Sequence, residues 1–309
     1  MQILKPKFWS KKNTILSFLM LPFSFLFQIL IKSKRIISKE KKFDIPIICI
    51  GNIFIGGTGK TPLSIFVAEE LKKNNKKPSI IKKFYSNHKD EHELIKDKIN
   101  CLYLARKRSD AIHQAMAAKC DLAILDDGFQ DFSIKKDLNI LCFNSKQLIG
   151  NGMTIPSGPL RESMSAIARA DIVVINGEKS KFFENLIFNI SKKTEIYYSK
   201  YIPINIDKFK NKKIFAFAGI GNPDNFFDIL TQYNLNIKKK IPYSDHYEFT
   251  KKELNEILDF SLKNNLQPIT TEKDYHRIKK FGFKNFDYLE LKLEIFEKNK
   301  FFKKVDGCL

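Results

Sequence analysis

A glycine-rich stretch near the start of the chain carries the residue types of a phosphate-binding loop. It spans residues 51–62, follows the apolar run 47–50 and precedes a segment with helical periodicity, 63–71. In this order, backbone N–H groups and a helix N-terminus converge on phosphate oxygens. We expect Lys60 to reach the β- and γ-phosphates of a nucleotide and the Thr61 hydroxyl to bind Mg²⁺. The rest of the expected nucleotide-binding loop is Gly56, Gly57, Thr58 and Gly59.

The loop departs from the strict pattern G-x-x-x-x-G-K-[ST] at one position. That pattern requires glycine six residues before the lysine, where this chain has Phe54. Glycine at 56, 57 and 59 still allows the backbone to approach phosphate closely. The alternative is a glycine-rich strand–helix turn with an incidental lysine.

Two aspartates follow a second apolar strand, residues 121–125. Asp126 and Asp127 match the acidic end of a strand that lies beside a phosphate loop and holds Mg²⁺, directly or through water. The alternative is an Asp-Asp-Gly turn, which is common at strand ends. Gln130, three residues further on, could orient a nucleophile or a phosphate.

Other candidate residues lie in loops. Arg161 follows a turn-rich loop and is a candidate clamp for a transferring phosphoryl group. Its neighbour Glu162 is a candidate metal ligand, and the alternative for both is a surface ion pair at a helix start. His246 is either a simple loop histidine or a group that moves a proton near neutral pH. Composition alone would place Asp90 in a solvated, charged loop.

The order of elements that must position these residues predicts an α/β fold. Apolar runs alternate with helical segments, which favours a mostly parallel sheet with ligands at the carboxyl ends of its strands. The polar stretch 177–211 is the expected boundary, and a second βα pattern begins at residue 213. We therefore expect a P-loop NTPase-like core and a second, smaller α/β domain. The expected division is an N-terminal membrane-anchor helix with basic flanks (1–42), a kinase core (43–200) and a C-terminal domain (201–309).

Residues 14–31 are free of charge and have lysines on both sides. As a helix they would be roughly 27 Å long, just short of a bilayer core of about 30 Å. The flanking charges give no clear orientation for a spanning helix, and no cleavage site indicates a signal peptide. An inserted or interfacial anchor, kinked at Pro22, fits best. A helix packed on a soluble domain is the remaining alternative.

The net charge of +20 suggests an anionic partner. Nearly all of the charge is lysine, whereas a nucleic-acid reader would use more arginine, so we expect no nucleic-acid partner. No feature of the sequence points to a protein partner. The five cysteines and five histidines show no metal-ligand spacing, and the cysteines read as reduced thiols of a cytosolic protein. The arginines are Arg35, Arg106, Arg108, Arg161, Arg169 and Arg277.

Taken in order, the motifs resemble those of the tetraacyldisaccharide 4′-kinase family, the lipid A kinases of Gram-negative bacteria. The resemblance runs from the hydrophobic segment to about Asp274, and several unrelated motifs agree in order and spacing. The family's phosphate loop likewise begins Gly-Asn. The matching motifs are Gly51-Asn52 with Gly56–Pro62, Asp126–Gln130, Gly150–Glu162, Phe217–Pro223, Asp245-His246 and Thr271–Asp274.

The resemblance implies an ATP- and Mg²⁺-dependent kinase that phosphorylates the 4′-hydroxyl of an acylated disaccharide 1-phosphate at the cytoplasmic face of the inner membrane. The enzyme would be peripheral to that membrane or anchored in it by residues 14–31. By position, Asp90 and His246 would form the dyad that takes the hydroxyl proton. Because the two lie in different expected domains, their meeting would need domain closure. The other members of the implied site are Lys60, Thr61, Asp126, Asp127, Gln130, Arg161 and Glu162.

The chain departs from the family pattern at several positions. Lys83-Phe84-Tyr85 stands for Arg-Gly-Tyr, Lys89 for the glycine before Asp90, and Asp131 for the histidine after Gln130. The competing hypothesis is a membrane-tethered P-loop ATPase or nucleotide-binding regulator without a lipid acceptor, which would turn over ATP alone.

Overall fold

A computed structural model describes residues 6–85, 89–245 and 247–309, and the side chains of residues 89 and 90 lie outside that description. The helices are α1 (Ile15–Leu19), α2 (Leu21–Ile37), α3 (Lys60–Lys73), α4 (Lys89–Lys98), α5 (Arg108–Ala117), α6 (Lys181–Ile190), α7 (Pro223–Gln232), α8 (Lys251–Lys263), α9 (Glu272–Lys279) and α10 (Lys298–Asp306), with short 3-10 helices η1 (Lys7–Ser10), η2 (Met164–Arg169) and η3 (Ile206–Phe209). The strands are β1 (Ile47–Gly51), β2 (Pro78–Lys83), β3 (Leu102–Ala105), β4 (Leu122–Asp126), β5 (Leu138–Asn144), β6 (Ile172–Asn176), β7 (Glu195–Pro203), β8 (Lys213–Ala218), β9 (Asn236–Pro242), β10 (Gln267–Thr271), β11 (Asp287–Leu289) and β12 (Leu291–Ile295).

The chain forms two compact units. The larger unit comprises residues 6–84, Ile99–Lys200 and Leu293–Leu309, and the smaller one comprises Tyr85–Lys98 and Tyr201–Lys292. The division differs from the expected one at two places. Residues 85–98 belong with the smaller unit because α4 packs on α9. The C-terminal segment returns to the larger unit, where Phe302 of α10 packs against Phe66 of α3.

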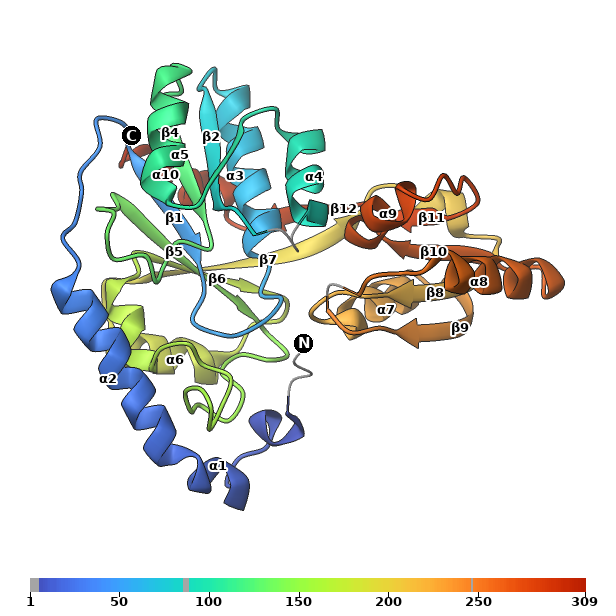
Figure 1. Ribbon diagram of the computed structural model, residues 1–309, viewed down its shortest axis with the longest axis horizontal. Helices are drawn as coiled ribbons and strands as arrows, with labels where there is room; N and C mark the ends of the chain where they lie inside the picture. Colours follow the sequence, from blue (N-terminus) through green and yellow to red (C-terminus); the bar gives the residue numbers. More distant parts are fainter. Residues whose placement is uncertain (1–5, 86–88, 246) are drawn as a thin grey trace. The chain divides into compact units, whose positions relative to one another are not determined.

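The larger unit contains an eight-stranded sheet in the order β12-β7-β6-β5-β1-β4-β2-β3 (Figure 1). From β7 to β3 every pairing with a described register is parallel. Strand β1 lies between β4 and β5. Strands β2, β3 and β4 lie on one side of β1, and strands β5, β6 and β7 lie on the other, so the order in which strands are added to the sheet reverses at β1. In open parallel sheets, ligands bind at the carboxyl ends of the strands next to such a point.

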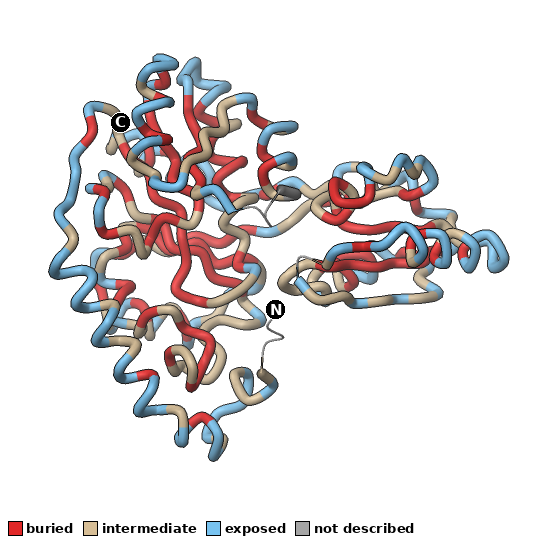
Figure 2. Tube along the Cα trace, viewed as in Figure 1, coloured by how far each residue is buried: buried red, intermediate tan, exposed pale blue. Residues whose placement is uncertain are grey.

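The central strands of this sheet (β1, β2, β4, β5 and β6) are buried, as Figure 2 shows, because helices cover both faces. On one face, side chains of β5 and β6 pack against Phe183 and Ile187 of α6. On the same face, Leu125 and Ile81 pack against Ala111 and Ala115 of α5. Helix α3 contacts β1, β2 and β4 on the other face. A strand that is buried on both faces reads in the sequence as a continuous apolar run, which is why these strands were predictable.

The smaller unit contains a four-stranded parallel sheet in the order β11-β10-β8-β9. Phe226 and Leu230 of α7 lie in one hydrophobic cluster of this unit. Phe217 and Phe249 lie in the other, together with Leu254 of α8. The second βα pattern of the sequence therefore forms a separate α/β body, as expected.

The N-terminal hydrophobic segment forms two helices rather than one. Helix α1 ends at Leu19, and α2 begins at Leu21 with Pro22 in its first turn, so the break at Met20 agrees with the expected kink. No helix within the described ranges 6–85, 89–245 and 247–309 is long and apolar enough to cross a membrane. The structure does not confirm that this segment is membrane-associated.

Buried hydroxyl groups fasten these two helices to the larger unit. The Ser24 hydroxyl donates to the Thr154 carbonyl at 2.8 Å and lies 2.8 Å from the Ser157 hydroxyl. Asn151 donates to the Ser17 hydroxyl at 3.1 Å. Most apolar side chains of the helices remain exposed. They include Ile15, Phe18, Leu19, Phe23, Phe25, Leu26, Ile29, Leu30, Ile36 and Ile37.

Candidate functional site

The predicted phosphate loop connects β1 to α3. Gly56 and Gly59 have φ angles of 118° and 91°, which side-chain-bearing residues rarely adopt. Gly59 immediately precedes α3, so the N-terminus of that helix opens onto the loop. Buried Asn52 donates to the Thr58 hydroxyl at 2.8 Å and fixes the loop from within. The loop therefore has the backbone form of a phosphate-binding loop. Phe54, which stands where the strict pattern has glycine, is buried.

The register of the sheet places Asp126 beside this loop. Strands β1 and β4 pair with Ile50 opposite Asp126, at the end where the loop begins. The Thr61 hydroxyl donates to Asp126 Oδ2 at 2.8 Å. A second donor, Lys82 Nζ at the end of β2, reaches the same oxygen at 2.5 Å. Two residues predicted to act on Mg²⁺ are therefore in direct contact.

Asp127 lies between two cations. Arg161 Nη1 donates to its carboxylate at 2.9 and 3.1 Å, and Lys60 Nζ lies 3.7 Å from Oδ1. Burial raises the pKa of the Asp127 carboxyl, but Lys60 and Arg161 outweigh burial and hold the pKa well below its usual value. The residue has a positive φ of 59° and its carbonyl accepts from Arg108 at 2.7 Å. The ionised carboxylate thus organises the loop lysine and the predicted arginine clamp.

Arg161 reaches this point because its loop pairs with the phosphate loop. Ile55 N donates to the Pro159 carbonyl, Arg161 N donates to the Ile53 carbonyl, and Leu160 forms a β-bridge with Phe54. These three contacts place the arginine beside the loop although the two segments are about a hundred residues apart in the chain.

Gln130 and Glu162 lie together on the other side of the loop backbone. Gln130 Nε2 donates to the Asn52 carbonyl at 2.9 Å and to Glu162 Oε1 at 3.0 Å. Arg169 donates to Glu162 Oε2 at 2.6 Å and stacks over the Phe129 ring at 4.4 Å. Both oxygens of Glu162 therefore accept from neighbouring side chains, and its role as a metal ligand stays a prediction.

The residues present fit a nucleotide-bound Mg²⁺. This ion uses one or two carboxylates together with phosphate oxygens and water, rather than a cage made of protein ligands. The Thr61 hydroxyl and the Asp126 carboxylate supply such oxygen donors at the loop. Within the part of the chain that the structure describes, no group of three or more His, Cys, Asp or Glu is arranged to hold a metal. The cysteines Cys49, Cys101, Cys120, Cys142 and Cys308 are free thiols.

Of the predicted Asp90–His246 dyad, only the backbone of Asp90 is described, and it lies in the smaller unit. Asp90 is in the first turn of α4, and His246 lies outside the described residues. Helix α4 groups with residues 201–292 and not with the rest of the expected core 43–200, so the expected boundary differs at this helix. Lys273 of α9 lies 2.8 Å from Glu91 Oε1 and 3.9 Å from Asp245 Oδ1. One lysine thus contacts the chain neighbours of both predicted dyad residues.

Charged contacts help to hold α4 in place, and Ile95 of this helix is fully buried. Lys98 forms ion pairs with Glu272 at 2.9 Å and with Glu290 at 2.5 Å. Burial lowers the pKa of the Lys98 ammonium, but these two carboxylates outweigh burial and raise it. Within α9, buried Asp274 accepts from Gly219 N at 2.9 Å and pairs with Arg277 at 2.7 Å. The helix that carries Lys273 is therefore anchored to the end of β8.

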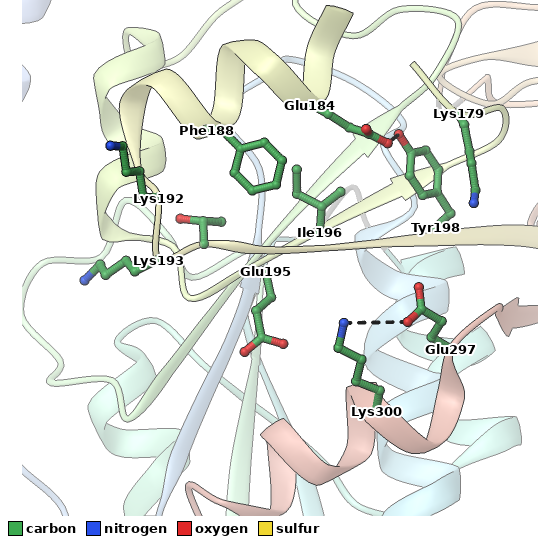
Figure 3. Close-up of a pocket in the computed structure, with 11 residues that line it drawn as sticks. Lys179, Glu184, Phe188, Lys192, Lys193, Glu195, Ile196, Tyr198, Glu297 and Lys300 are labelled. Carbon is green, nitrogen blue, oxygen red and sulfur yellow. Dashed lines mark hydrogen bonds and ion pairs between the residues drawn. The ribbon is translucent and has the colours of Figure 1, made fainter. Parts of the chain in front are cut away.

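A cavity of about 370 Å³ lies elsewhere in the larger unit, between α6, β7 and α10 (Figure 3). Its carboxylates are already engaged, because Glu184 accepts from Tyr198 and Glu297 lies 3.6 Å from Lys300. None of the predicted site residues lines it. We therefore do not place the functional site there.

Three basic residues at the two sites had no predicted role. Lys82 lies near the carboxyl end of β2, and a lysine at the carboxyl end of a strand next to the phosphate loop is the signal that could have identified it. Arg169 is one of few arginines, which is a similar signal. Lys273 lies within one of the matching motifs, but only the structure shows its two partners.

Comparison with known proteins agrees with this geometry. A family model described as tetraacyldisaccharide-1-P 4′-kinase matches residues 16–309. A tetraacyldisaccharide 4′-kinase of Pelagibacter ubique is 42% identical over 301 residues, covering 96% of this chain and 95% of the relative. One from Coxiella burnetii is 33% identical over 300 residues, covering 89% and 86%.

A solved structure shares the fold. LpxK from Aquifex aeolicus, crystallised in complex with ATP, superposes with a TM-score of 0.73 at 24% identity, covering 95% of this chain and 99% of that one. This likeness confirms the predicted α/β fold. Together with the family model and the two relatives, it confirms the resemblance seen in the sequence. The chain belongs to the tetraacyldisaccharide-1-P 4′-kinase family.

Proposed function

We propose that this chain transfers the γ-phosphoryl group of ATP to the 4′-hydroxyl of a tetraacyldisaccharide 1-phosphate, a step of lipid A biosynthesis. The observation that carries the proposal is the convergence at one loop of Lys60, Thr61 and Arg161 with two aspartates. Phosphoryl transfer needs little covalent chemistry from a protein, and positioning with electrostatic stabilisation is most of the catalysis.

On the nucleotide side, the loop backbone and Thr58 cradle phosphate oxygens, and Lys60 neutralises the β- and γ-phosphates. Arg161 stabilises charge on the transferring group. Asp127 holds both cations near the loop before a nucleotide binds. Thr61 and Asp126 hold Mg²⁺, which when bound neutralises phosphate charge. Gln130 and Glu162 brace the loop through the Asn52 carbonyl.

On the acceptor side, Asp90 and His246 take the proton from the attacking hydroxyl. A histidine can exchange that proton near neutral pH, and a neighbouring carboxylate favours its charged form. The support for this pair is the grouping of α4 with residues 201–292 and the contacts of Lys273 with Glu91 and Asp245. Lys273 is a positioning residue in this scheme.

The acylated acceptor explains the exposed apolar side chains of α1 and α2. A surface this apolar on a protein that is otherwise charged is typical of an interfacial segment. Lys32, Lys34 and Arg35 lie in the same helix and suit anionic head groups. We propose that these helices lie on the cytoplasmic face of the inner membrane and bring the site to a lipid that stays in the bilayer.

The decisive experiment supplies purified protein with Mg²⁺, γ-labelled ATP and the tetraacyldisaccharide 1-phosphate, and follows label in the lipid. We expect label transfer that depends on both acceptor and metal. Normal ATP hydrolysis without any labelled lipid would refute the kinase assignment and favour an ATPase that acts without a lipid acceptor.

Membrane docking is tested separately with vesicles that contain anionic lipid. Replacing Phe25 and Leu26 by glutamate should abolish co-sedimentation, because two charges then face the acyl chains. The matched control replaces exposed Leu262 of α8 by glutamate. Equal vesicle binding by both variants would contradict the docking of α2.

A further inference from the structure

Lys82 is a buried cation at the nucleotide site. Strands β2 and β4 pair with Ile81 opposite Leu125, so Lys82 lies beside Asp126 at the carboxyl edge of the sheet. Lys82 is 6% exposed and Asp126 is fully buried. Lys82 Nζ lies 2.5 Å from Asp126 Oδ2 and 3.5 Å from the Thr61 hydroxyl. The ammonium group therefore touches both groups that fit a nucleotide-bound metal.

A buried carboxylate needs a positive partner, because an uncompensated charge in the protein interior is very costly. Asp126 Oδ2 receives hydrogen bonds from both Thr61 and Lys82. Lys60, the usual cation of such a loop, instead lies 3.7 Å from Asp127. Each of the two consecutive aspartates thus pairs with a different lysine. Lys82, the partner of Asp126, contacts the Asp126 and Thr61 oxygens that would bind Mg²⁺.

We propose that Lys82 is an internal counter-cation that competes with the divalent metal for Asp126. In the nucleotide-free protein it holds the carboxylate directed toward Thr61. When a metal–nucleotide complex binds, the ammonium gives up its contact with Oδ2. The inference rests on the proposed nucleotide site, but it requires no particular acceptor.

A permanent ion pair would behave differently. If Lys82 only stabilised the fold, its removal would weaken the protein and added Mg²⁺ would not restore the loss. If Lys82 and the metal share one carboxylate, each compensates for the absence of the other. The distinguishing quantity is therefore the dependence of stability on Mg²⁺, compared between the wild-type protein and a Lys82 variant.

The test uses full-length Lys82→Met with MgCl₂ alone, followed by calorimetric titration and thermal unfolding. We expect Mg²⁺ to bind the variant at least about tenfold more tightly than the wild type, because a competing charge at contact distance is gone. Without metal, the Tm of the variant should fall by several degrees, and Mg²⁺ should restore most of that loss through binding to the folded state. KCl of equal ionic strength should not restore the Tm of the variant.

The matched control is Lys76→Met, which removes an exposed lysine from the turn before β2. This variant should match the wild type in Mg²⁺ affinity and in Tm. A Lys82→Met protein whose Mg²⁺ affinity lies within twofold of the wild type, or whose Tm does not recover with Mg²⁺, overturns the proposal.

A measurement on the wild-type protein covers the case in which Lys82→Met does not fold. With lysine labelled at ¹³Cε, the Lys82 resonance is identified by its absence from Lys82→Arg. Mg²⁺ with a nonhydrolysable ATP analogue should move this resonance away from its position in the analogue with EDTA. An unchanged resonance in the metal-loaded protein overturns the proposal. This experiment contains no lipid acceptor, so its outcome does not depend on whether the protein phosphorylates the lipid.

Discussion

The phosphate loop of the larger unit differs in its construction from the region of the smaller unit where α4 packs on α9. We call this region, which includes Glu91, Asp245 and Lys273, the α4–α9 edge. At the loop, Lys60 and Thr61 are consecutive, and so are Asp126 and Asp127, so two short runs of sequence supply four of the site residues. Lys82 and Arg161 come from two further segments. At the α4–α9 edge, the partners of Lys273 are Glu91 and Asp245, which lie 182 and 28 residues away in the chain.

Phosphate binding and proton transfer place different structural requirements on these two regions. Binding phosphate needs a backbone shape and fixed charge, which a short run of glycines and one helix N-terminus provide. Moving a proton from a hydroxyl needs an acid–base pair whose geometry depends on distant segments. We therefore expect changes at the loop to alter nucleotide affinity and turnover together, and changes at the α4–α9 edge to alter turnover alone.

Lys60→Ala should have the largest effect. Loss of the cation that faces the β- and γ-phosphates should lower kcat/KM for ATP by about 1,000-fold, the scale for removing one strong stabiliser of transition-state charge. The measurement is label transfer to the disaccharide acceptor. A rate near that of the wild type would refute the loop assignment.

Asp90→Asn and His246→Ala should each lower kcat at least about 100-fold, as expected for loss of general base catalysis, with the ATP KM unchanged. Steady-state kinetics at saturating acceptor provide the measurement. Glu93→Ala changes an exposed carboxylate on the same helix and serves as the control. If neither substitution lowers kcat, the general base is another residue, and the contrast between the phosphate loop and the α4–α9 edge is wrong.

Lys273→Met should have a smaller effect at the same edge. Removing the ammonium breaks the contacts with Glu91 and Asp245, which should lower kcat about tenfold while ATP affinity stays constant. Lys280→Met, which removes an exposed ion pair with Glu248, is the matched control. A change in ATP KM instead of kcat would show that Lys273 belongs functionally with the nucleotide site.

Gln130→Ala should have the smallest effect. The substitution removes two hydrogen bonds that brace the loop, and at about 1 kcal/mol for each bond the ATP KM should rise severalfold with little change in kcat. Nucleotide titration of the variant measures this directly. A large loss of kcat would mean that Gln130 contacts the reacting groups.

The sequence predicted the larger unit well and the α4–α9 edge poorly, for a physical reason. Strands β1, β4, β5 and β6 are buried on both faces and read as apolar runs. Helix α4 was missed because most of its residues are charged, with Lys98 paired to Glu272 of α9 and to Glu290, so its sequence resembles a solvated loop although Ile95 is buried. Periodicity reveals apolar packing, and it cannot show which distant charges will pair.

The two buried serines of the N-terminal helices have a practical consequence. Removing residues 1–42 to obtain a more soluble protein would take away the partners of Ser157 and Asn151, along with the Trp9 contact to the Pro156 carbonyl. Water would replace these partners, so each lost hydrogen bond would cost about 1 kcal/mol. The affected loop is the one that presents Arg161 to Asp127. A shortened enzyme would therefore lose order in its phosphate site, and solubility is better sought by replacing exposed apolar side chains of α2 while Ser17 and Ser24 are kept.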